Sequence, residues 1–252
     1  MSAPLPPAAR DVLLGLADDE ICLGHWYATW MGLGPFLEED LATTSIGQDE
    51  LGHARALYAL VEPGGDVDAL AYGRAASGYR SSWLAELAIE RWEDLFARHL
   101  LYDEAEAVRW EALVGSSVPG LGAVAERALH EEVYHTRHAR SLFSRLMAGG
   151  PEGRARVSAA LERVLPLAVG LFEPTEGDEA AVAEGAVAAP AAEQGAEWRR
   201  RVERLLAEVG HSVAWPELSS GPHGRRGVRS PAFAPMFAEM TRVYALDPSA
   251  RW

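Results

Sequence analysis

Two short motifs in this chain pair a carboxylate with an imidazole at a spacing that suits metal binding. Glu50 and His53 form one Glu-x-x-His motif, and Glu132 and His135 form the other. On a helix, residues three positions apart lie on one face about one turn from each other. A single motif of this kind also arises by chance in a Glu-rich chain, so the interpretation depends on whether other helices bring matching carboxylates to the same level.

Two further carboxylates lie where antiparallel helical hairpins would bring them to these motifs. Glu20 precedes Glu50 by 30 residues, and the midpoint is Pro35 in a turn rich in Gly and Pro. Asp103 precedes Glu132 by 29 residues, and the midpoint again falls in a loop of helix-breaking residues. Residues equidistant from the turn of a helical hairpin lie at the same height. We therefore expect Glu20 to face Glu50, and Asp103 to face Glu132.

All four carboxylates lie in apolar stripes of their predicted helices. Leu16 and Leu23 flank Glu20 at helical spacing, and Leu100 flanks Asp103. Buried together, the four charges would repel, and each would cost several kcal/mol of desolvation unless a cation neutralised it. No Lys or Arg recurs at these heights, whereas two divalent ions would balance the four charges. Oxygen and imidazole ligands suit iron or manganese, so the sequence predicts a site for two iron ions, with manganese as the alternative metal.

The predicted ligands are Glu20, Glu50, His53, Asp103, Glu132 and His135. Asp49 and Glu131, which precede the motif glutamates, are predicted to accept the free N–H of the opposing pair's histidine and so to fix its ring. Glu104 and Glu106 are alternatives to Asp103, but their helical angles agree less well with the apolar stripe. The aromatic side chains near the site, Tyr27, Phe96 and Trp110, are assigned to the bundle core.

The elements that must position these residues are all helical, because Ala, Leu, Glu and Arg dominate and strand-like alternation is rare. We predict bundle helices at about 8–31, 37–61, 83–114 and 120–147, later helices at 152–172 and 197–209, and a short helix near 234–244. The predicted fold is an all-α, ferritin-like four-helix bundle in a single domain, 1–252. Its core bundle covers about 8–147, and its helical C-terminal extension covers about 151–252.

Composition excludes several classes of protein. The 252 residues carry a formal net charge of −14, which argues against a nucleic-acid-binding protein. No apolar stretch approaches the ~20 residues of a membrane span, and no signal peptide is recognised at the N-terminus. A single cysteine, Cys22, excludes an intramolecular disulfide and a Cys-rich metal site. We expect an acidic cytoplasmic protein with no membrane contact.

The sequence also resembles the PaaA/PaaC family, the subunits of bacterial phenylacetyl-CoA epoxidase. The resemblance runs from Leu13 to Trp252, and its length and closing segment are closer to the smaller, PaaC-type members. The segments that carry it are GLGPFLEEDLATTSIGQDELGHARALY, EEVYHTRHAR and GVRSPAFAPMFAEMTRVYALDP.

This resemblance implies a ferritin-like fold in a multisubunit oxygenase that uses O2 to epoxidise the aromatic ring of phenylacetyl-CoA. It also implies a larger PaaA-type catalytic partner that carries the di-iron centre, and a separate reductase that supplies electrons from NADPH. In the family the PaaC-type subunit is commonly a structural partner whose metal ligands have been replaced. This sequence departs from that pattern, because all six predicted ligands are present.

Coenzyme A is anionic, so an acidic chain would need local arginines to contact it. Two clusters are candidates for contact with coenzyme A or with a partner subunit: Arg199, Arg200, Arg201 and Arg204, and Arg225, Arg226 and Arg229. Three functions remain open: an oxygenase subunit that keeps its di-metal site, a structural subunit that docks a catalytic paralogue, and a self-assembled ferritin-like protein that handles iron or peroxide. Each predicts a homo- or hetero-oligomer.

Overall fold

The computed structural model describes residues 5–217 and 223–250, and this part of the chain contains helices and no strand. The long helices are α1 (Pro7–Thr29), α2 (Leu37–Val61), α5 (Trp92–Glu111), α6 (Leu121–Ala148), α7 (Pro151–Ala168) and α9 (Ala191–Glu208). The shorter ones are α3 (Val67–Tyr72), η1 (Ala76–Gly78), α4 (Trp83–Glu86), η2 (Val169–Phe172), α8 (Asp178–Ala183), α10 (Phe233–Met240) and α11 (Arg242–Leu246). None of the described helices is long and apolar enough to cross a membrane.

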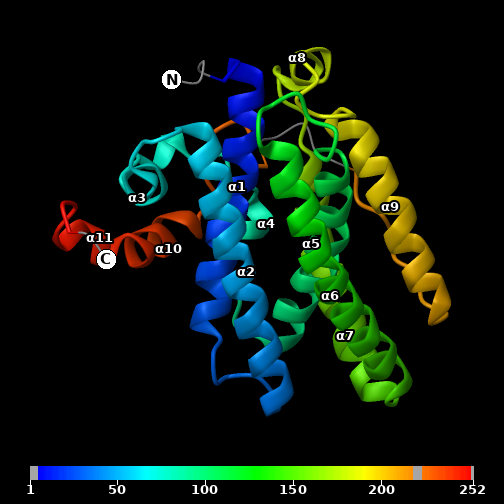
Figure 1. Ribbon diagram of the computed structural model, residues 1–252. Coiled ribbons are helices and arrows are strands. Elements are labelled where there is room, and N and C mark those ends of the chain that lie inside the picture. The colour runs from blue at the N-terminus through cyan, green and yellow to red at the C-terminus, as the bar shows by residue number, and fades with distance from the viewer. Residues whose placement is uncertain (1–4, 218–222, 251–252) are drawn as a thin grey trace.

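The core is a ferritin-like four-helix bundle made of two hairpins. In the first, α1 packs along α2, and in the second, α5 packs along α6 (Figure 1). Helices α7 and α9 pack on the outer side of α5 and belong to the C-terminal extension. The hairpins turn where the sequence places breakers. The first turn contains Gly32 in a left-handed conformation, and α6 begins directly after Gly120, which is also left-handed.

The predicted continuous helix 83–114 is wrong, because it is interrupted between Glu86 and Trp92. Glu86 is buried and accepts a hydrogen bond from the backbone N–H of Ser230 in the C-terminal tail. The carbonyl of Leu87, which a helix would use internally, accepts instead from Arg98 Nη1 at 3.0 Å. These tertiary hydrogen bonds replace the helical ones and separate α4 from α5.

Helix α9 begins at Ala191, six residues before the predicted start at 197. Gly195 lies inside this helix, against Phe172. A Cβ at Gly195 would lie only 3.1 Å from the Cβ of Phe172, so the glycine allows η2 and α9 to approach closely.

The C-terminal tail is tied to the bundle core by buried ion pairs. Arg225 Nη2 lies 2.5 Å from Asp19 Oδ2 on α1, and Arg229 Nη1 lies 2.6 Å from Glu86 Oε1 on α4. Gly224 has φ of +118°, and a Cβ there would overlap the carbonyl oxygen of Ser81. The tail thus depends on a glycine to approach the chain between α3 and α4.

We predict that Gly224→Ala destabilises the fold by roughly 3 kcal/mol, because the new methyl group meets backbone at a φ that favours glycine. Gly210→Ala is the control, since Gly210 has φ of +64° but no atom within 4 Å of a Cβ. That substitution should cost only about 1 kcal/mol. Urea unfolding followed by circular dichroism measures both, and equal losses in the two variants would contradict the close approach of the tail.

Candidate metal centre

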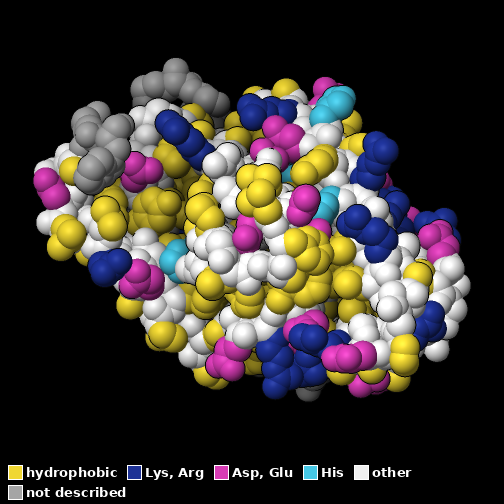
Figure 2. Space-filling model, turned by 90° about the horizontal axis from the view of Figure 1, so that it is seen from below, with side chains coloured by type: hydrophobic (Ala, Val, Ile, Leu, Met, Phe, Trp, Pro, Cys, Tyr) yellow, Lys and Arg dark blue, Asp and Glu magenta, His cyan; other side chains and the backbone are white. Residues whose placement is uncertain are grey.

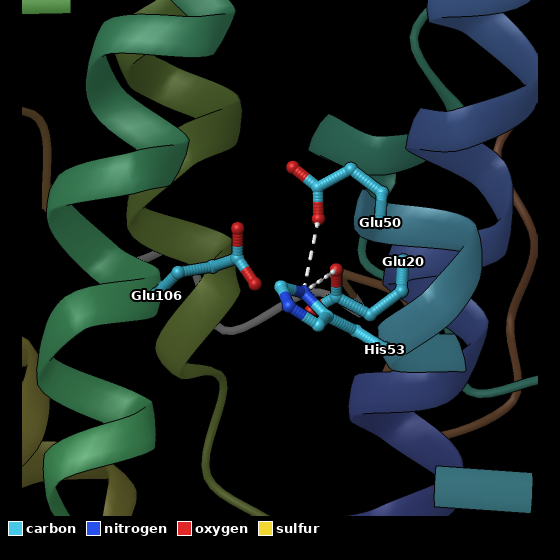
Figure 3. Close-up of side chains that lie close together, drawn as sticks. All are labelled: Glu20, Glu50, His53 and Glu106. Atoms are coloured by element: carbon cyan, nitrogen blue, oxygen red, sulfur yellow. Dashed lines mark ion pairs between the residues drawn. The ribbon is translucent and has the colours of Figure 1, made fainter. Parts of the chain in front are cut away.

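Four buried side chains from three helices of the bundle meet in its interior. Glu20 comes from α1, Glu50 and His53 from α2, and Glu106 from α5, and each offers one ligand atom within 4.8 Å of the others. Figure 3 shows Glu20, Glu50 and His53 facing Glu106 across the bundle. His53 Nδ1 lies 3.7 Å from Glu20 Oε2 and 3.7 Å from Glu50 Oε2. This is the facing of Glu20 and Glu50 that the first hairpin predicts.

The second Glu-x-x-His motif lies on α6 and is also buried. His135 Nδ1 lies 3.0 Å from Glu132 Oε1. The charges of Glu106 and Asp103 both act on Glu132, so the two halves of the site are in electrostatic contact. All six predicted ligands are therefore buried in the interior.

The third-helix residue in the four-membered cluster is Glu106, which the sequence analysis gave as an alternative to Asp103. The ligand role of Asp103 stays a prediction, as do those of Glu132 and His135, which also lie outside this cluster. Asp103 is fully buried one turn earlier on α5, where its Oδ1 lies 3.1 Å from His99 Nδ1. The other alternative, Glu104, pairs with Arg140 of α6, with Nη2 2.7 Å from Oε2. Glu106 therefore stands beside Asp103 as a candidate ligand from α5.

The inward-facing atoms of the site lack hydrogen-bond partners among the described residues. These atoms are Glu20 Oε2, both carboxylate oxygens of Glu50 and Asp103, His53 Nδ1, Glu106 Oε2 and Glu132 Oε2. A buried polar atom without a partner costs free energy, and such atoms are rare in folded proteins. Converging oxygen and imidazole lone pairs without protein donors are what iron or manganese ions would satisfy. The donor set thus fits a carboxylate and histidine metal centre.

The acids next to Glu20 on α1 show how this protein neutralises buried carboxylates elsewhere. Asp18, Asp19 and Glu20 are all fully buried. Asp18 pairs with Arg74, and Asp19 pairs with Arg109 at 2.8 Å and with Arg225 at 2.5 Å. No arginine lies within ion-pair distance of Glu20 among the described residues. Of three consecutive buried acids, only the one that points into the bundle therefore depends on another source of positive charge.

The pKa values of the interior carboxyl groups are raised, because these groups are buried close to one another without an arginine partner among the described residues. Burial and the nearby charge of Glu50 raise the pKa of Glu20 to about 8, and burial and the charge of Glu106 raise the pKa of Glu50 to about 7. Burial and the Glu106 charge raise the pKa of Glu132 to about 8. Burial lowers the pKa of His135, but its hydrogen bond with Glu132 and the surrounding carboxylates outweigh this effect and raise it to about 11.

Outer carboxylates hold the two histidines in place. His53 Nε2 lies 2.7 Å from Glu131 Oε2, and His135 Nε2 lies 3.1 Å from Asp49 Oδ2. Each acid comes from the helix that carries the opposing motif, and both contacts predicted from the sequence are present, while the ligand role of the histidines stays a prediction. An imidazole that donates Nε2–H to a carboxylate keeps the lone pair of Nδ1 directed into the site.

Two aromatic residues also bond to the site, which the sequence interpretation missed. Trp110 Nε1 donates to Glu106 Oε1 at 3.1 Å, and its ring meets His53 edge-on with centroids 5.3 Å apart. The hydroxyl of Tyr102 donates to Glu20 Oε1 at 3.4 Å. Trp110 follows Glu106 by four positions, which places both side chains on one face of α5. This spacing is the feature of the sequence that could have predicted the hydrogen bond between them.

The arginines of α9 lie on the outside of the molecule. Arg199 and Arg200 have side chains that are 53% and 68% exposed, and Arg204 is exposed. Arg201 pairs with Glu111 of α5, with Nη2 2.7 Å from Oε2. The exposed arginines are accessible from outside, and their contact with coenzyme A or a partner subunit stays a prediction.

The arginines of the tail take different places. The side chain of Arg229 is 11% exposed and bonds to Glu86 and to the hydroxyl of Ser81, and its predicted contact with coenzyme A or a partner subunit stays a prediction. Arg225 and Arg226 line a cavity at the end of the bundle where α8 lies. Arg226 Nε donates to Glu173 at 2.6 Å.

The fold and this cluster define a ferritin-like bundle with an interior suited to metal ions. The family model described as "Phenylacetic acid catabolic protein" matches residues 4–252, and the chain belongs to this family. It is similar to one of the subunits of the 1,2-phenylacetyl-CoA epoxidase of Escherichia coli (strain K12), with 30% identity over 242 residues. The match covers 95% of this chain and 97% of that relative.

We predict that the metal-free protein loses stability as pH rises from about 5 to about 9. Glu20, Glu50 and Glu132 have folded-state pKa values raised above 4.5 to about 8, 7 and 8, so the stability they contribute below 4.5 is lost as each one ionises. His135, raised from 6.5 to about 11, acts in the same direction at higher pH. Thermal unfolding after chelation should therefore show a falling Tm.

Added Fe(II) or Mn(II) should reverse this trend, because the ligands bind metal only when deprotonated. Glu50→Gln serves as the control, since it removes one of the titrating groups and should flatten the pH dependence. A metal-free Tm that rises between pH 5 and pH 8 would contradict the burial of these carboxylates without partners.

The identity of the third-helix ligand is tested by Glu106→Gln and Asp103→Asn. We expect Glu106→Gln to lower the bound iron by at least half, because Glu106 is the α5 residue in the four-membered cluster. Asp103→Asn should have a smaller effect, and Glu104→Gln, which touches only the outer ion pair with Arg140, should have none. Elemental analysis of protein purified with iron measures the bound iron in all three variants. A larger loss in Asp103→Asn than in Glu106→Gln would identify Asp103 as the α5 ligand, as the sequence predicts.

Proposed function

We propose that this chain is a subunit of a multicomponent di-iron monooxygenase that epoxidises the aromatic ring of phenylacetyl-CoA, and that it binds a di-metal centre itself. The observation that carries the proposal is the buried cluster of Glu20, Glu50, His53 and Glu106. Membership of the phenylacetic acid catabolic family and similarity to an epoxidase subunit support the reaction and the substrate.

Glu20, Glu50, His53 and Glu106 would hold one part of the centre, and Glu132 and His135, with Asp103 nearby, the other. Iron bound there would supply the reductive activation of O2 that monooxygenation requires, with electrons from NADPH through a separate reductase. The residues of this chain do the positioning. Glu131 and Asp49 orient the two imidazoles, and Trp110 fixes one oxygen of Glu106. Burial of the whole cluster keeps bulk water away from it.

An apolar surface at the turn between α1 and α2 supports a role as one subunit among several. Five large hydrophobic side chains within eleven residues are 47–67% exposed: Met31, Leu33, Phe36, Leu37 and Leu41. Figure 2 views the molecule from this end and shows hydrophobic side chains gathered there. Exposed apolar patches of this kind mark interaction sites. The proposal assigns this end to contact with a larger, catalytic subunit of the same assembly in the cytoplasm.

The proposal is tested in the assembled complex. The chain is co-expressed with the larger subunit and the reductase, and the assay follows NADPH-dependent O2 uptake and the epoxidised thioester by mass spectrometry. We expect wild-type chain to contain about two equivalents of iron. Glu50→Ala and Glu132→Ala should lose metal and, while still co-purifying with the larger subunit, lower the activity of the complex at least tenfold.

Three outcomes distinguish the possible roles. Full activity in a complex whose variant chain is metal-free would overturn the di-metal proposal and support the structural subunit. Wild-type metal content in both variants would show that the ligands are wrongly assigned. A chain that co-purifies with no partner and forms a homo-oligomer with ferroxidase activity would support the third role, an iron-handling protein.

A further inference from the structure

A cavity of about 400 Å³ lies at the end of the bundle where α1 begins and α8 lies (Figure 1). Its walls come from the first half of α1, Arg80, the end of α5, the segments 171–178 and 187–194, and the tail. None of the described residues that line it is a predicted metal ligand. The volume falls within the range of small-molecule sites, about 300–1,000 Å³.

One arginine of the cavity wall has no acidic partner among the described residues. Four arginines line the cavity: Arg80, Arg109, Arg225 and Arg226. Two buried carboxylates neutralise part of this charge. Asp19 pairs with Arg109 and Arg225, and Glu173 pairs with Arg226. The side chain of Arg80 donates to carbonyl oxygens, those of Ser77 and Tyr79, and no carboxylate of the described chain lies within ion-pair distance of it.

The other acids of the wall form no ion pair with Arg80 or Arg109 among the described residues. Asp11 and Glu176 are exposed to solvent, where their charge is screened. Asp178 accepts hydrogen bonds from the hydroxyl and the backbone N–H of Thr175. Arg80 therefore remains a wall arginine that no described acid pairs with.

Arg109 is a second arginine of the wall whose donors are not all used within the described chain, and its guanidinium lies over the ring of Tyr102, 4.8 Å from the centroid. Its side chain is only 6% exposed, and it lines the cavity. Nη1 donates to Asp19, but Nε and Nη2 have no hydrogen-bond partner among the described residues. Buried guanidinium N–H groups without acceptors are costly, and an oxyanion provides the acceptors that match their fork.

The remaining wall is apolar. Its side chains are Val12, Leu16, Leu113, Leu171, Phe172 and Val187. A cavity with an apolar wall and a few convergent polar groups is the usual form of a site for a ligand with a hydrophobic body and one polar end. We infer that this cavity binds a small amphipathic oxyanion, whose apolar body lies against these side chains and whose carboxylate or phosphate group lies toward Arg80 and Arg109.

Arg109 connects the wall of this cavity with the helices that carry the metal cluster. It follows Glu106 by three positions on α5 and pairs with Asp19, which precedes Glu20 on α1. Of this ion pair, Arg109 is the member that lines the cavity. The inference does not rest on the proposed function, because the cavity uses none of the predicted ligands and can be tested on metal-free protein.

Isothermal titration calorimetry on the full, metal-free chain tests the inference, with phenylacetate as an aryl carboxylate and phenylacetyl-CoA as a phosphate-bearing thioester. We expect saturable binding of at least one probe. Inorganic phosphate, which lacks the apolar body, and benzyl alcohol, which lacks the anion, should each bind at least tenfold more weakly. Phenylacetate binding would identify a carboxylate ligand, and binding of the thioester alone would identify the coenzyme phosphate.

Two variants place the binding in this cavity. Arg80→Ala should weaken binding at least tenfold, and the matched control Arg55→Ala, an exposed arginine of α2, should leave it unchanged. Ala189→Trp, at a half-buried wall position, should fill the cavity and abolish binding without removing a core side chain. No binding of either probe, or equal binding after Ala189→Trp in a variant with wild-type circular dichroism, would overturn the inference.

Discussion

Carboxylates buried inside a helical bundle are the constraint on which the rest of this structure depends. Glu20, Glu50, Glu106 and Glu132 form no ion pair with any arginine of the described chain, and two histidines are the nearest groups that can carry positive charge. Each unneutralised charge would cost several kcal/mol in a medium of low polarity. The charge is removed either by protonation, which the raised pKa values of Glu20, Glu50 and Glu132 favour, or by bound cations, and the second way connects the amino-acid sequence with the proposed metal-dependent function.

The buried acids of the described chain fall into two groups, those that pair with an arginine and those that do not. Arginines from distant segments neutralise Asp18 and Asp19, and in doing so they tie the segment 62–82 and the C-terminal tail to α1. The interior acids have no arginine partner among the described residues, and Trp110 donates a hydrogen bond to one of them, Glu106. Glu131 and Asp49 bond to the two histidines of the site. Arginine side chains thus connect distant segments to α1. Arg109 and Arg225 also line the cavity at the end of the bundle.

Local pattern predicted most of the helices, and it failed where tertiary contacts replaced local ones. The ranges of α1, α2 and α6 follow from periodicity and from Gly and Pro at their ends, within about two residues. The break between α4 and α5 has no local signal, because it depends on hydrogen bonds from Ser230 to Glu86 and from Arg98 to Leu87. The first turns of α9 were also missed, and Gly195 within them packs closely on Phe172.

The sequence by itself determined an all-helical bundle, the facing of Glu20 with Glu50, and the crossed contacts of His53 with Glu131 and of His135 with Asp49. These follow from helical periodicity and from symmetry about a turn, which are local properties. Only the tertiary structure brought Glu106, one turn from Asp103 on the same helix, together with Glu20, Glu50 and His53. It alone also formed the arginine-lined cavity, because segments far apart in the chain meet there only after the fold is complete.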